Sequence, residues 1–548
     1  MTGTIRILKA RKIITMNRHR PEATHVAIRD GRILAAGDLD ELAGWGAYEL
    51  DERFADKVLM PGFVEGHCHV MEGRVWDYPY IGFQDRHDPD GRVWPGLGTI
   101  EAVVAALQEA EAKLADPNET LFAWGFDPIY FTGRRMLASD LDRVSTTRPI
   151  LILHSNGHLL NVNSRIMELA GIDRSTNVEG VIKGADGNPT GELQEMAAKY
   201  MAHRVAGNPF KERMNDVALY RMSRAATRAG VTTATDLHAT LDDVTVETYA
   251  RMAARDDFAL RLVPAMGAAT VPIEEGIATV KRLQKSNVDK LHYGLVKIMT
   301  DGSIQGFSGR MKWPGYYNGK PNGVWNLAPA ELHAQVQAYH DAGLQLHMHV
   351  NGDEASELML DALEEALQRT PRGDHRHTLQ HCQMADESQF RRMAALGVCV
   401  NLFANHLYYW GDQHYAITMG PDRAARMDAT GTALRCGVPL AIHSDAPVTP
   451  LAPLFTAWCA VNRQTSSGRV LGPGERLSVE QALFAITLGA AYTLRLDDKV
   501  GSIESGKFAD FAVLDDDPTA VAPEALKDIG IWGTIVGGLP AEAPKPQA

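Results

Sequence analysis

From about residue 218 onward, the chain alternates between two patterns of hydrophobic and polar positions. In the first, apolar residues recur three or four positions apart and the segment ends in glycine, which is typical of an amphipathic helix. In the second, a short apolar and β-branched run ends in a polar residue, which is typical of a buried strand. The two patterns follow each other in the pairs 218–230 and 231–236, 330–343 and 344–350, 387–397 and 398–403, and 427–437 and 438–445. This alternation predicts the βα units of a parallel sheet.

The spacing of polar residues at the strand ends favours a closed barrel. Such a barrel uses about 30 residues per βα unit. His349 and His381 are about one unit apart, and His381 and Asp445 are about two units apart. We therefore expect a (β/α)8 TIM-like barrel with these residues on strands five, six and eight, and with strand one in residues 61–69. A doubly wound open sheet would alternate in the same way, but polar residues at so many strand ends favour the barrel.

The rest of the chain of 548 residues departs from this cycle. Both ends predict short strands with turn signals, such as the hairpin dipeptide Asp30-Gly31. The stretch after strand one holds a predicted helix at 99–116 and aromatic-rich loops. We expect three parts. A composite β-sandwich domain is formed by 1–60 plus 498–545, and the barrel by 61–71 plus 216–497. Residues 72–215 form an inserted subdomain over the barrel mouth.

Two histidines at the end of predicted strand one are candidate metal ligands. His67 and His69 are two residues apart, so on a strand their side chains share one face. Neutral imidazole is a common ligand for zinc. Further candidates stand at the ends of later predicted strands, where the active sites of barrels form: Lys297, His349, His381 and Asp445.

Each candidate has a structural alternative. A histidine at a strand end can be a polar residue satisfied within the fold. Lys297 can be a buried lysine paired with Asp301, and Asp445, close to Pro447, can cap a following helix. Six such coincidences in chain order are much less probable than any one of them, which makes a metal site the better interpretation.

Composition and charge narrow the class of partner. The net charge of −13, from 55 basic and 68 acidic residues, argues against nucleic acid or an anionic membrane as the main partner. The five cysteines form no CxxC pair, so neither a disulfide framework nor a thiolate zinc site is indicated. No apolar run approaches the ~20 residues that span a bilayer, and the start lacks the apolar centre of a signal peptide. We expect a cytoplasmic protein that acts on a small molecule.

Several stretches resemble a known family. HSNGHLLNVNSRIMELAGI, NPTGELQE, VKIMTDGSIQG, HVNGDEA, HSDAPVTPLAP and the closing SVEQALFAITLGAAYTLRLDDKVGSIESGKFADFAVLD are similar to the amidohydrolase superfamily. Within it they resemble amidohydrolase family 3, and most closely its branch around N-substituted formamide deformylase. The resemblance covers almost the whole chain. It is specific for the family and weak for the substrate.

The resemblance implies a zinc centre of one or two divalent ions. His67 and His69 would hold one ion, and His349 and His381 the second. Lys297 would be N6-carboxylated and bridge the two positions. A lysine desolvated among cations can lose its proton and take up carbon dioxide, which agrees with that role.

In the same resemblance Asp445 is both a metal ligand and the catalytic base. We expect metal-activated hydroxide to cleave a C–N bond of a non-peptide amide or N-substituted formamide. A deaminase, a cyclic-amide hydrolase or an esterase on the same site is an alternative. A catalytically inactive binding scaffold of the same fold is another. Family habit alone suggests a homodimer.

Candidates for substrate contact come mostly from the insertion. They are His154, His158 and Trp124, together with His406 further along the chain. Two histidines beside the predicted ligands keep open roles. His347 would orient its neighbour His349 or lie in the core. We expect His443 to face away from the neighbours of Asp445 and to be structural.

Overall fold

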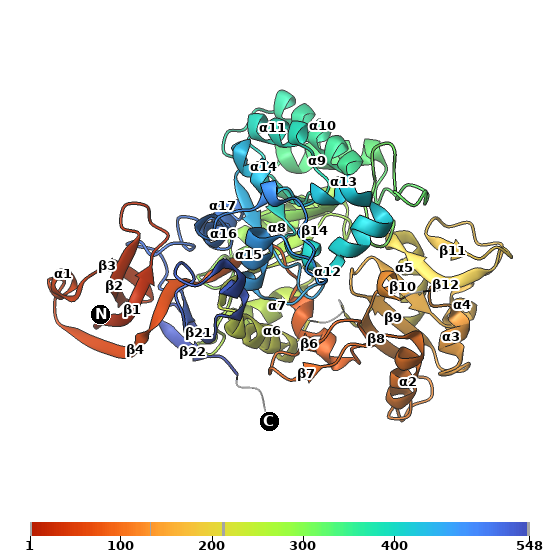
Figure 1. The fold of residues 1–548 in the computed structure, drawn as a ribbon, viewed down its shortest axis with the longest axis horizontal. Coiled ribbons are helices and arrows are strands. Elements are labelled where there is room, and N and C mark those ends of the chain that lie inside the picture. Colours follow the sequence, from red (N-terminus) through yellow and green to blue (C-terminus); the bar gives the residue numbers. More distant parts are fainter. Residues whose placement is uncertain (1–2, 132, 211–213, 545–548) are drawn as a thin grey trace.

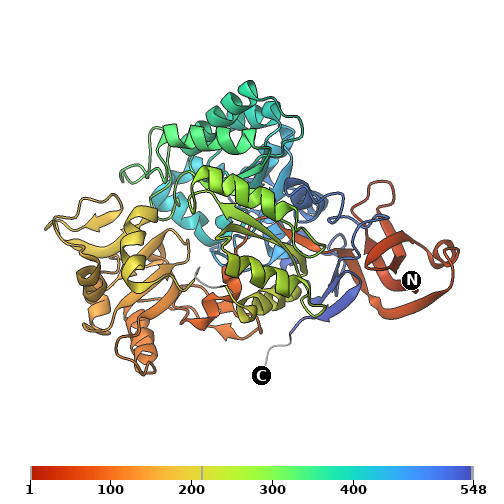
Figure 2. The same ribbon diagram turned by 180° about the vertical axis from the view of Figure 1, so that it is seen from behind.

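The computed structural model describes residues 3–131, 133–210 and 214–544. Figures 1 and 2 show a central barrel with two additional parts on opposite sides of it. One part is a sheet that contains strands from both ends of the chain, and the other is the segment that follows the first barrel strand. Within the described residues no helix has the length and apolar character needed to cross a membrane.

The barrel consists of one eight-stranded parallel sheet, as the sequence predicts. Its strands pair in chain order: β5 (Phe63–Glu65), β13 (Val231–Ala239), β14 (Arg261–Gly267), β15 (Leu295–Met299), β16 (Gln345–Val350), β17 (Thr378–His381), β18 (Cys399–Leu402) and β19 (Leu440–Ile442). Just beyond the first and last strands, the amide of Asp445 donates to the carbonyl of His67 at 3.1 Å, and that of His69 to the carbonyl of Ala446 at 2.8 Å. These bonds bring the two ends of the sheet together as a TIM-like barrel.

Helices surround the barrel (Figures 1 and 2), and many of them bury apolar residues in the core around its strands. They are α6 (Asp216–Arg228), α7 (Asp243–Ala253), α8 (Ile273–Gln284), α9 (Pro329–Asp341), α10 (Asp353–Arg369), α11 (Glu387–Leu396), α12 (Asn405–Gln413), η4 (His414–Thr418), α13 (Gly420–Ala425), α14 (Thr430–Arg435), α15 (Pro453–Asn462), η5 (Pro473–Glu475), α16 (Val479–Ala485) and α17 (Leu488–Thr493). Glycine in the left-handed conformation at Gly397 ends α11, which is the stop signal that the sequence carries there.

The strands of both chain ends form a single seven-stranded sheet in the order β22-β21-β20-β4-β1-β2-β3. They are β1 (Ile5–Ile14), β2 (Glu22–Arg29), β3 (Arg32–Gly37), β4 (Tyr48–Pro61), β20 (Phe511–Leu514), β21 (Ile531–Val536) and β22 (Leu539–Glu542), with helices α1 (Leu39–Ala43) and η6 (Pro523–Asp528). The two sheets of the expected sandwich are therefore not confirmed. The long strand β4 pairs with β1 along its length and with β20 at its end, which joins all the strands into one sheet.

The segment between β5 and β13 has its own five-stranded sheet in the order β11-β12-β10-β9-β8. Its elements are η1 (Val70–Gly73), η2 (Val75–Asp77), β6 (Arg86–His87), β7 (Val93–Trp94), α2 (Ile100–Glu111), β8 (Leu121–Phe126), η3 (Pro128–Tyr130), α3 (Ala138–Asp142), β9 (Ile150–His154), β10 (Leu159–Val162), α4 (Ser164–Ala170), β11 (Val181–Lys183), β12 (Pro189–Gln194) and α5 (Glu195–Ala206). Two separate apolar clusters lie inside it, so this insertion has a core of its own.

Candidate metal centre

A cavity of about 1240 Å³ lies between the carboxyl ends of the barrel strands and the insertion. All six residues predicted as metal ligands line it: His67, His69, Lys297, His349, His381 and Asp445. Lys297 lies on β15, His349 on β16 and His381 at the end of β17, and Asp445 follows β19. The strands thus bring together residues that are nearly 400 positions apart in the chain.

Three of these residues have metal-ligand spacing. The Nε2 atoms of His67 and His69 each lie 3.3 Å from Oδ1 of Asp445, and all three atoms lie within 4.8 Å of one another. Two ligands of a tetrahedral zinc ion lie about 3.3 Å apart when each is bound at about 2.0–2.1 Å. Oδ1 of Asp445 is buried and accepts no hydrogen bond from any described residue. Two imidazoles and an acceptor oxygen without a donor form a set that fits a divalent cation.

Hydrogen bonds fix the orientation of His67. Its Nδ1–H donates to Oε1 of Gln380 at 2.8 Å, and Nε2 of Gln380 donates to Nδ1 of His347 at 2.7 Å. Burial lowers the pKa of His67 well below its usual value, and the charge of Lys297 adds to this effect. The ring is therefore neutral, and its Nε2 presents a lone pair toward Asp445. His347 accepts the hydrogen bond from Gln380 and so helps to orient His67, not its sequence neighbour His349.

His69 has a carboxylate on its other side. Nδ1 of His69 lies 3.9 Å from Oδ1 of Asp236, a residue of barrel strand β13. The hydroxyl of Tyr249 donates to Oδ2 of Asp236 at 2.7 Å, and the amide of Val70 donates to Oδ1 at 3.3 Å. A carboxylate behind a ligating histidine is the usual means of orienting the ring and raising its basicity.

The backbone turns sharply at two of the candidate ligands. Both His381 (φ 71°) and Asp445 (φ 54°) have left-handed backbone, which non-glycine residues rarely adopt and which costs of order 1–3 kcal/mol at each position. The carboxylate of Glu65 accepts from the amide and hydroxyl of Ser444, at 3.1 and 2.8 Å, which holds the segment before Asp445 against β5. Asp445 does not cap a helix, because the next helix, α15, begins at Pro453 after Ala452.

Lys297 lies inside the barrel, where 1% of its surface is exposed. Burial lowers the pKa of the surrounding imidazoles, and the charge of Lys297 lowers it further. The affected residues are His67, His347, His349, His381 and His443. Asp301, the alternative partner considered for Lys297, has a carboxylate with several backbone donors. That carboxylate accepts the backbone amides of Arg310, Asn351 and Gly352, each at 2.9 Å.

His349 and His381 face each other with ring centroids 4.6 Å apart. Nε2 of His349 lies 3.1 Å from the side-chain Nδ2 of Asn351 and 3.6 Å from Oδ1 of Asp301. Nδ1 of His381 lies 3.9 Å from Oδ2 of Asp445. Among the described residues, the groups of three or more histidine, cysteine or carboxylate ligands at metal-binding spacing do not include His349.

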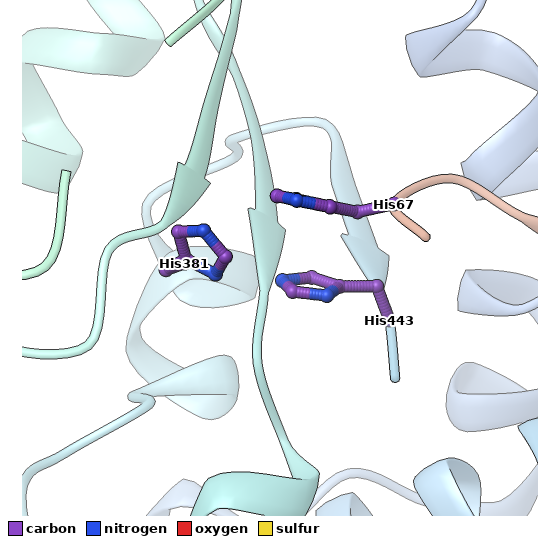
Figure 3. A group of neighbouring side chains, drawn as sticks. All are labelled: His67, His381 and His443. Carbon is purple, nitrogen blue, oxygen red and sulfur yellow. The ribbon is translucent and has the colours of Figure 1, made fainter. Parts of the chain in front are cut away.

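The expectation that His443 faces away from the site is wrong. Its ring stacks on that of His67, with centroids 4.6 Å apart and planes at 18°, and lies 5.0 Å from the ring of His381. Figure 3 shows the three side chains pointing toward one another, with His67 above His443 and His381 approaching from β17. Phe403 stacks on the other side of His443 at 4.9 Å. His443 is two residues before Asp445, and residues two apart on a strand share a face, so strand alternation agrees with the observed position and the expectation misapplied it.

The insertion supplies the opposite wall of the cavity, and His154, His158 and Trp124 all line it. Nδ1–H of His158 donates to Glu195 at 2.9 Å, and the ring of His158 lies 5.0 Å from that of His349. His154 is hydrogen-bonded to Asn161 at 2.6 Å. Trp124 lies on strand β8.

His406 is not among the residues that line the cavity. Its Nε2 lies 3.1 Å from Oε1 of Gln305, and its Nδ1 lies 3.1 Å from Nε2 of His414. The ring is buried beside Phe403 and Trp410. α12 therefore places this side chain in a packed aromatic layer, and contact of His406 with substrate stays a prediction.

Comparisons with known proteins agree with the resemblance seen in the sequence. The sequence profile of the amidohydrolase family matches residues 55–541. Amidohydrolase YtcJ of Bacillus subtilis is 27% identical over 539 residues, which cover 96% of this chain and 97% of that protein. The N-substituted formamide deformylase of Arthrobacter pascens is 25% identical over 526 residues, which cover 94% of each. A metal-dependent hydrolase of Pyrococcus horikoshii, 18% identical, shares the fold with a TM-score of 0.70 over 95% of this chain and 99% of that one.

Proposed function

This chain belongs to the amidohydrolase family, and on that premise we propose that it is a metal-dependent hydrolase of a C–N bond in a non-peptide amide or N-substituted formamide. The observation that carries the proposal is the spacing of His67, His69 and Asp445, with 3.3 Å from each imidazole nitrogen to one carboxylate oxygen. These atoms face a cavity large enough for a substituted small molecule.

His67, His69 and Asp445 would hold the ion, and two nitrogen donors with one oxygen donor suit zinc. When bound, such an ion lowers the pKa of a coordinated water from ~15.7 towards ~7 and polarises a substrate carbonyl. The donors are prepared for it: burial keeps His67 neutral, and Gln380 holds its ring in one orientation.

Asp445 is the proposed acid and base. Its Oδ1 faces the two imidazoles, while Oδ2 lies toward His381. A carboxylate so placed can accept the proton of the attacking water and later donate it to the leaving amine nitrogen. The left-handed backbone at Asp445 and the bonds from Ser444 to Glu65 hold it in position through both transfers.

Lys297, His349 and His381 form the remaining part of the proposed centre. A carboxylated Lys297 would place an anion among several neutral imidazoles, and it would be the natural bridge to a second ion near His349 and His381. Two groups of described residues have the spacing of metal ligands, His67 with His69 and Asp445, and His67 with His381 and His443; both contain His67, and neither contains His349. His381 is also a candidate hydrogen-bond donor to the substrate carbonyl.

The walls of the cavity suggest the kind of substrate. The insertion contributes apolar side chains, among them Val75, Trp124, Leu153 and Phe210. His158, oriented by Glu195, adds a polar group close to His349. An amide or formamide with a bulky apolar or aryl substituent on nitrogen fits this combination. The similarity to an N-substituted formamide deformylase supports the same substrate class.

The test is a panel of N-formyl and N-acyl amines, with the released products identified and a chelator control. Formate or another carboxylate together with an amine supports the proposal. Released ammonia would instead indicate a deaminase, a ring-opened acid a cyclic-amide hydrolase, and selective cleavage of matched esters an esterase. A protein that holds no tightly bound metal and has an unmodified Lys297 would be an inactive scaffold.

A further inference from the structure

We propose that Arg86, a residue of the insertion, is a positioning residue that holds the two metal-ligand segments of the barrel in register with each other. The inference rests on the proposed metal site at His67, His69 and Asp445. It assigns a role to a buried cation that lies behind the cavity wall rather than in it.

Arg86 begins the short strand β6 and is 5% exposed. Its Nη1 donates to the carbonyl oxygen of Pro447 at 3.0 Å. Pro447 is two residues after Asp445 and lines the cavity together with Val448. The amide of Val448 donates to the carbonyl of Asp445 at 2.7 Å, so the segment is a tight turn. Arg86 therefore fixes the turn that carries the proposed base.

The same guanidinium reaches the segment after His69. Its Nη2 lies 3.5 Å from Oε2 of Glu72, which is 3% exposed. Glu72 belongs to helix η1, and its amide donates to the carbonyl of His69 at 3.0 Å. Because Arg86 attracts Glu72 and bonds Pro447, one side chain ties the His69 segment to the Asp445 segment.

Arg86 also contacts the wall that faces the substrate. Its guanidinium lies 5.5 Å from the ring centroid of Trp124, a lining residue on β8. Nε and Nη2 of Arg86 and Oε2 of Glu72 form no hydrogen bond with any described residue. A buried ion pair with so few hydrogen bonds gives little net stability, because desolvation offsets the attraction. The better explanation for a buried arginine at this position is therefore geometric: Arg86 links the insertion to the barrel at the proposed site.

The experiment compares Arg86→Met, Arg86→Lys and the double variant Arg86→Met/Glu72→Gln in the full chain. The double variant removes the carboxyl that Arg86→Met leaves buried without its cation. Arg148→Met is the matched control, since Arg148 is also a buried arginine of the insertion, but donates to Glu111 at 2.9 Å and to loop carbonyls away from the cavity. The readouts are the affinity for Co²⁺, the absorption spectrum of bound Co²⁺, thermal stability, and kcat and KM on an N-formyl amine.

We expect Co²⁺ affinity to fall about 10–100-fold in Arg86→Met and in the double variant, with a changed Co²⁺ spectrum, and kcat to fall while KM stays within about threefold. Arg86→Lys restores part of the loss, and Arg148→Met loses stability only. The proposal is overturned if the double variant binds Co²⁺ like the wild type, or if Arg148→Met shows the same losses. Should the wild type hydrolyse no amide, the proposed function fails, but the Co²⁺ readouts still decide the role of Arg86.

Discussion

The two ends of the barrel each contain a cluster of buried histidines, and the clusters differ in how their ring nitrogens are used. At the carboxyl ends of the strands, the upper cluster consists of His67, His69, His381 and His443, with Asp445 beside it. At the opposite end, His340 of α9 and His375 and His377 before β17 lie together in the core. The residue type is the same, and every one of these histidines except His69 is buried, so we compare how their ring nitrogens are bonded.

In the lower cluster (His340, His375 and His377) every ring nitrogen has a partner. The amide of Leu346 donates to Nδ1 of His377 at 3.1 Å, so Nε2–H of His377 donates to Nδ1 of His340 at 2.9 Å. Nε2–H of His340 then donates to the carbonyl of Thr370 at 2.7 Å. His375 accepts from the amide of His377 and donates to the carbonyl of Leu396. This end of a barrel is the one associated with stability.

In the upper cluster, Nδ1 of His381 and both ring nitrogens of His443 have no hydrogen-bond partner among the described residues. Leaving buried polar atoms unsatisfied costs about 1–3 kcal/mol each, unless a water, ion or substrate satisfies them. The comparison teaches that bonding capacity left open, rather than residue type, distinguishes the histidines around the proposed metal site from those of the lower cluster.

The largest expected effect concerns the carboxylate that only the upper cluster has. Asp445→Asn removes the proposed base while keeping the shape of the side chain. We expect kcat to fall about 10³-fold, within the range for loss of general acid–base catalysis, with metal content largely retained. Steady-state kinetics together with metal analysis of the purified variant make the check. Full activity in Asp445→Asn would remove Asp445 from the mechanism.

A matched pair of substitutions separates the clusters directly. His67→Asn should weaken zinc affinity by at least about 100-fold with little change in unfolding free energy, because a ligand is lost. His377→Asn should do the reverse: zinc affinity stays the same, and stability falls by about 1–3 kcal/mol as buried partners lose their bonds. Zinc titration and urea unfolding of both variants provide the measurements. Equal zinc losses in the two variants would abolish the distinction.

Gln380 tests whether the orientation of an upper histidine matters. Gln380→Leu removes both the acceptor for Nδ1–H of His67 and the donor to His347. We expect about a 10–100-fold loss in metal affinity or activity, the usual effect of removing an orienting partner. Gln389→Leu, on α11 away from the cavity, is the control. If Gln380→Leu had the same metal affinity and activity as that control, metal binding would not depend on the orientation of the His67 ring.

The smallest effect is a pH dependence of stability from the lower cluster. Burial lowers the pKa of His340, His375 and His377 below the ordinary value of about 6.5, so the unfolded chain binds these protons more readily than the folded one. Stability is therefore full above about pH 6.5 and falls as the pH drops below it, by up to about 1.4 kcal/mol per group at pH 5.5. Urea unfolding at pH 7.5 and 5.5 measures the difference. The variant His377→Gln should reduce it, and an unchanged difference would contradict the assignment.

Much of the barrel could be predicted because its signals are local. Helical periodicity, glycine stops and β-branched runs specify each βα unit, and the spacing of His349, His381 and Asp445 specifies strands five, six and eight. The polar residue at the end of a strand was a sound signal as well. The same signal would have found Asp236, the carboxylate behind His69, which ends the predicted strand at 231–236.

The remainder depended on long-range geometry. Gln380 is an ordinary residue in LQHCQ, and only the pairing of β17 with β16 shows that it bridges His67 and His347. His443 is different, because it is two residues before Asp445 and plain strand alternation already puts both on one face. His406 carried no local sign that α12 would turn it into an aromatic layer.

The most direct test is anomalous X-ray diffraction at the zinc edge from crystals of the zinc-loaded protein. The account predicts a peak within about 2.0–2.2 Å of Nε2 of His67, Nε2 of His69 and a carboxylate oxygen of Asp445. A zinc-loaded crystal with no peak there, or with its strongest peak elsewhere in the barrel, would contradict it.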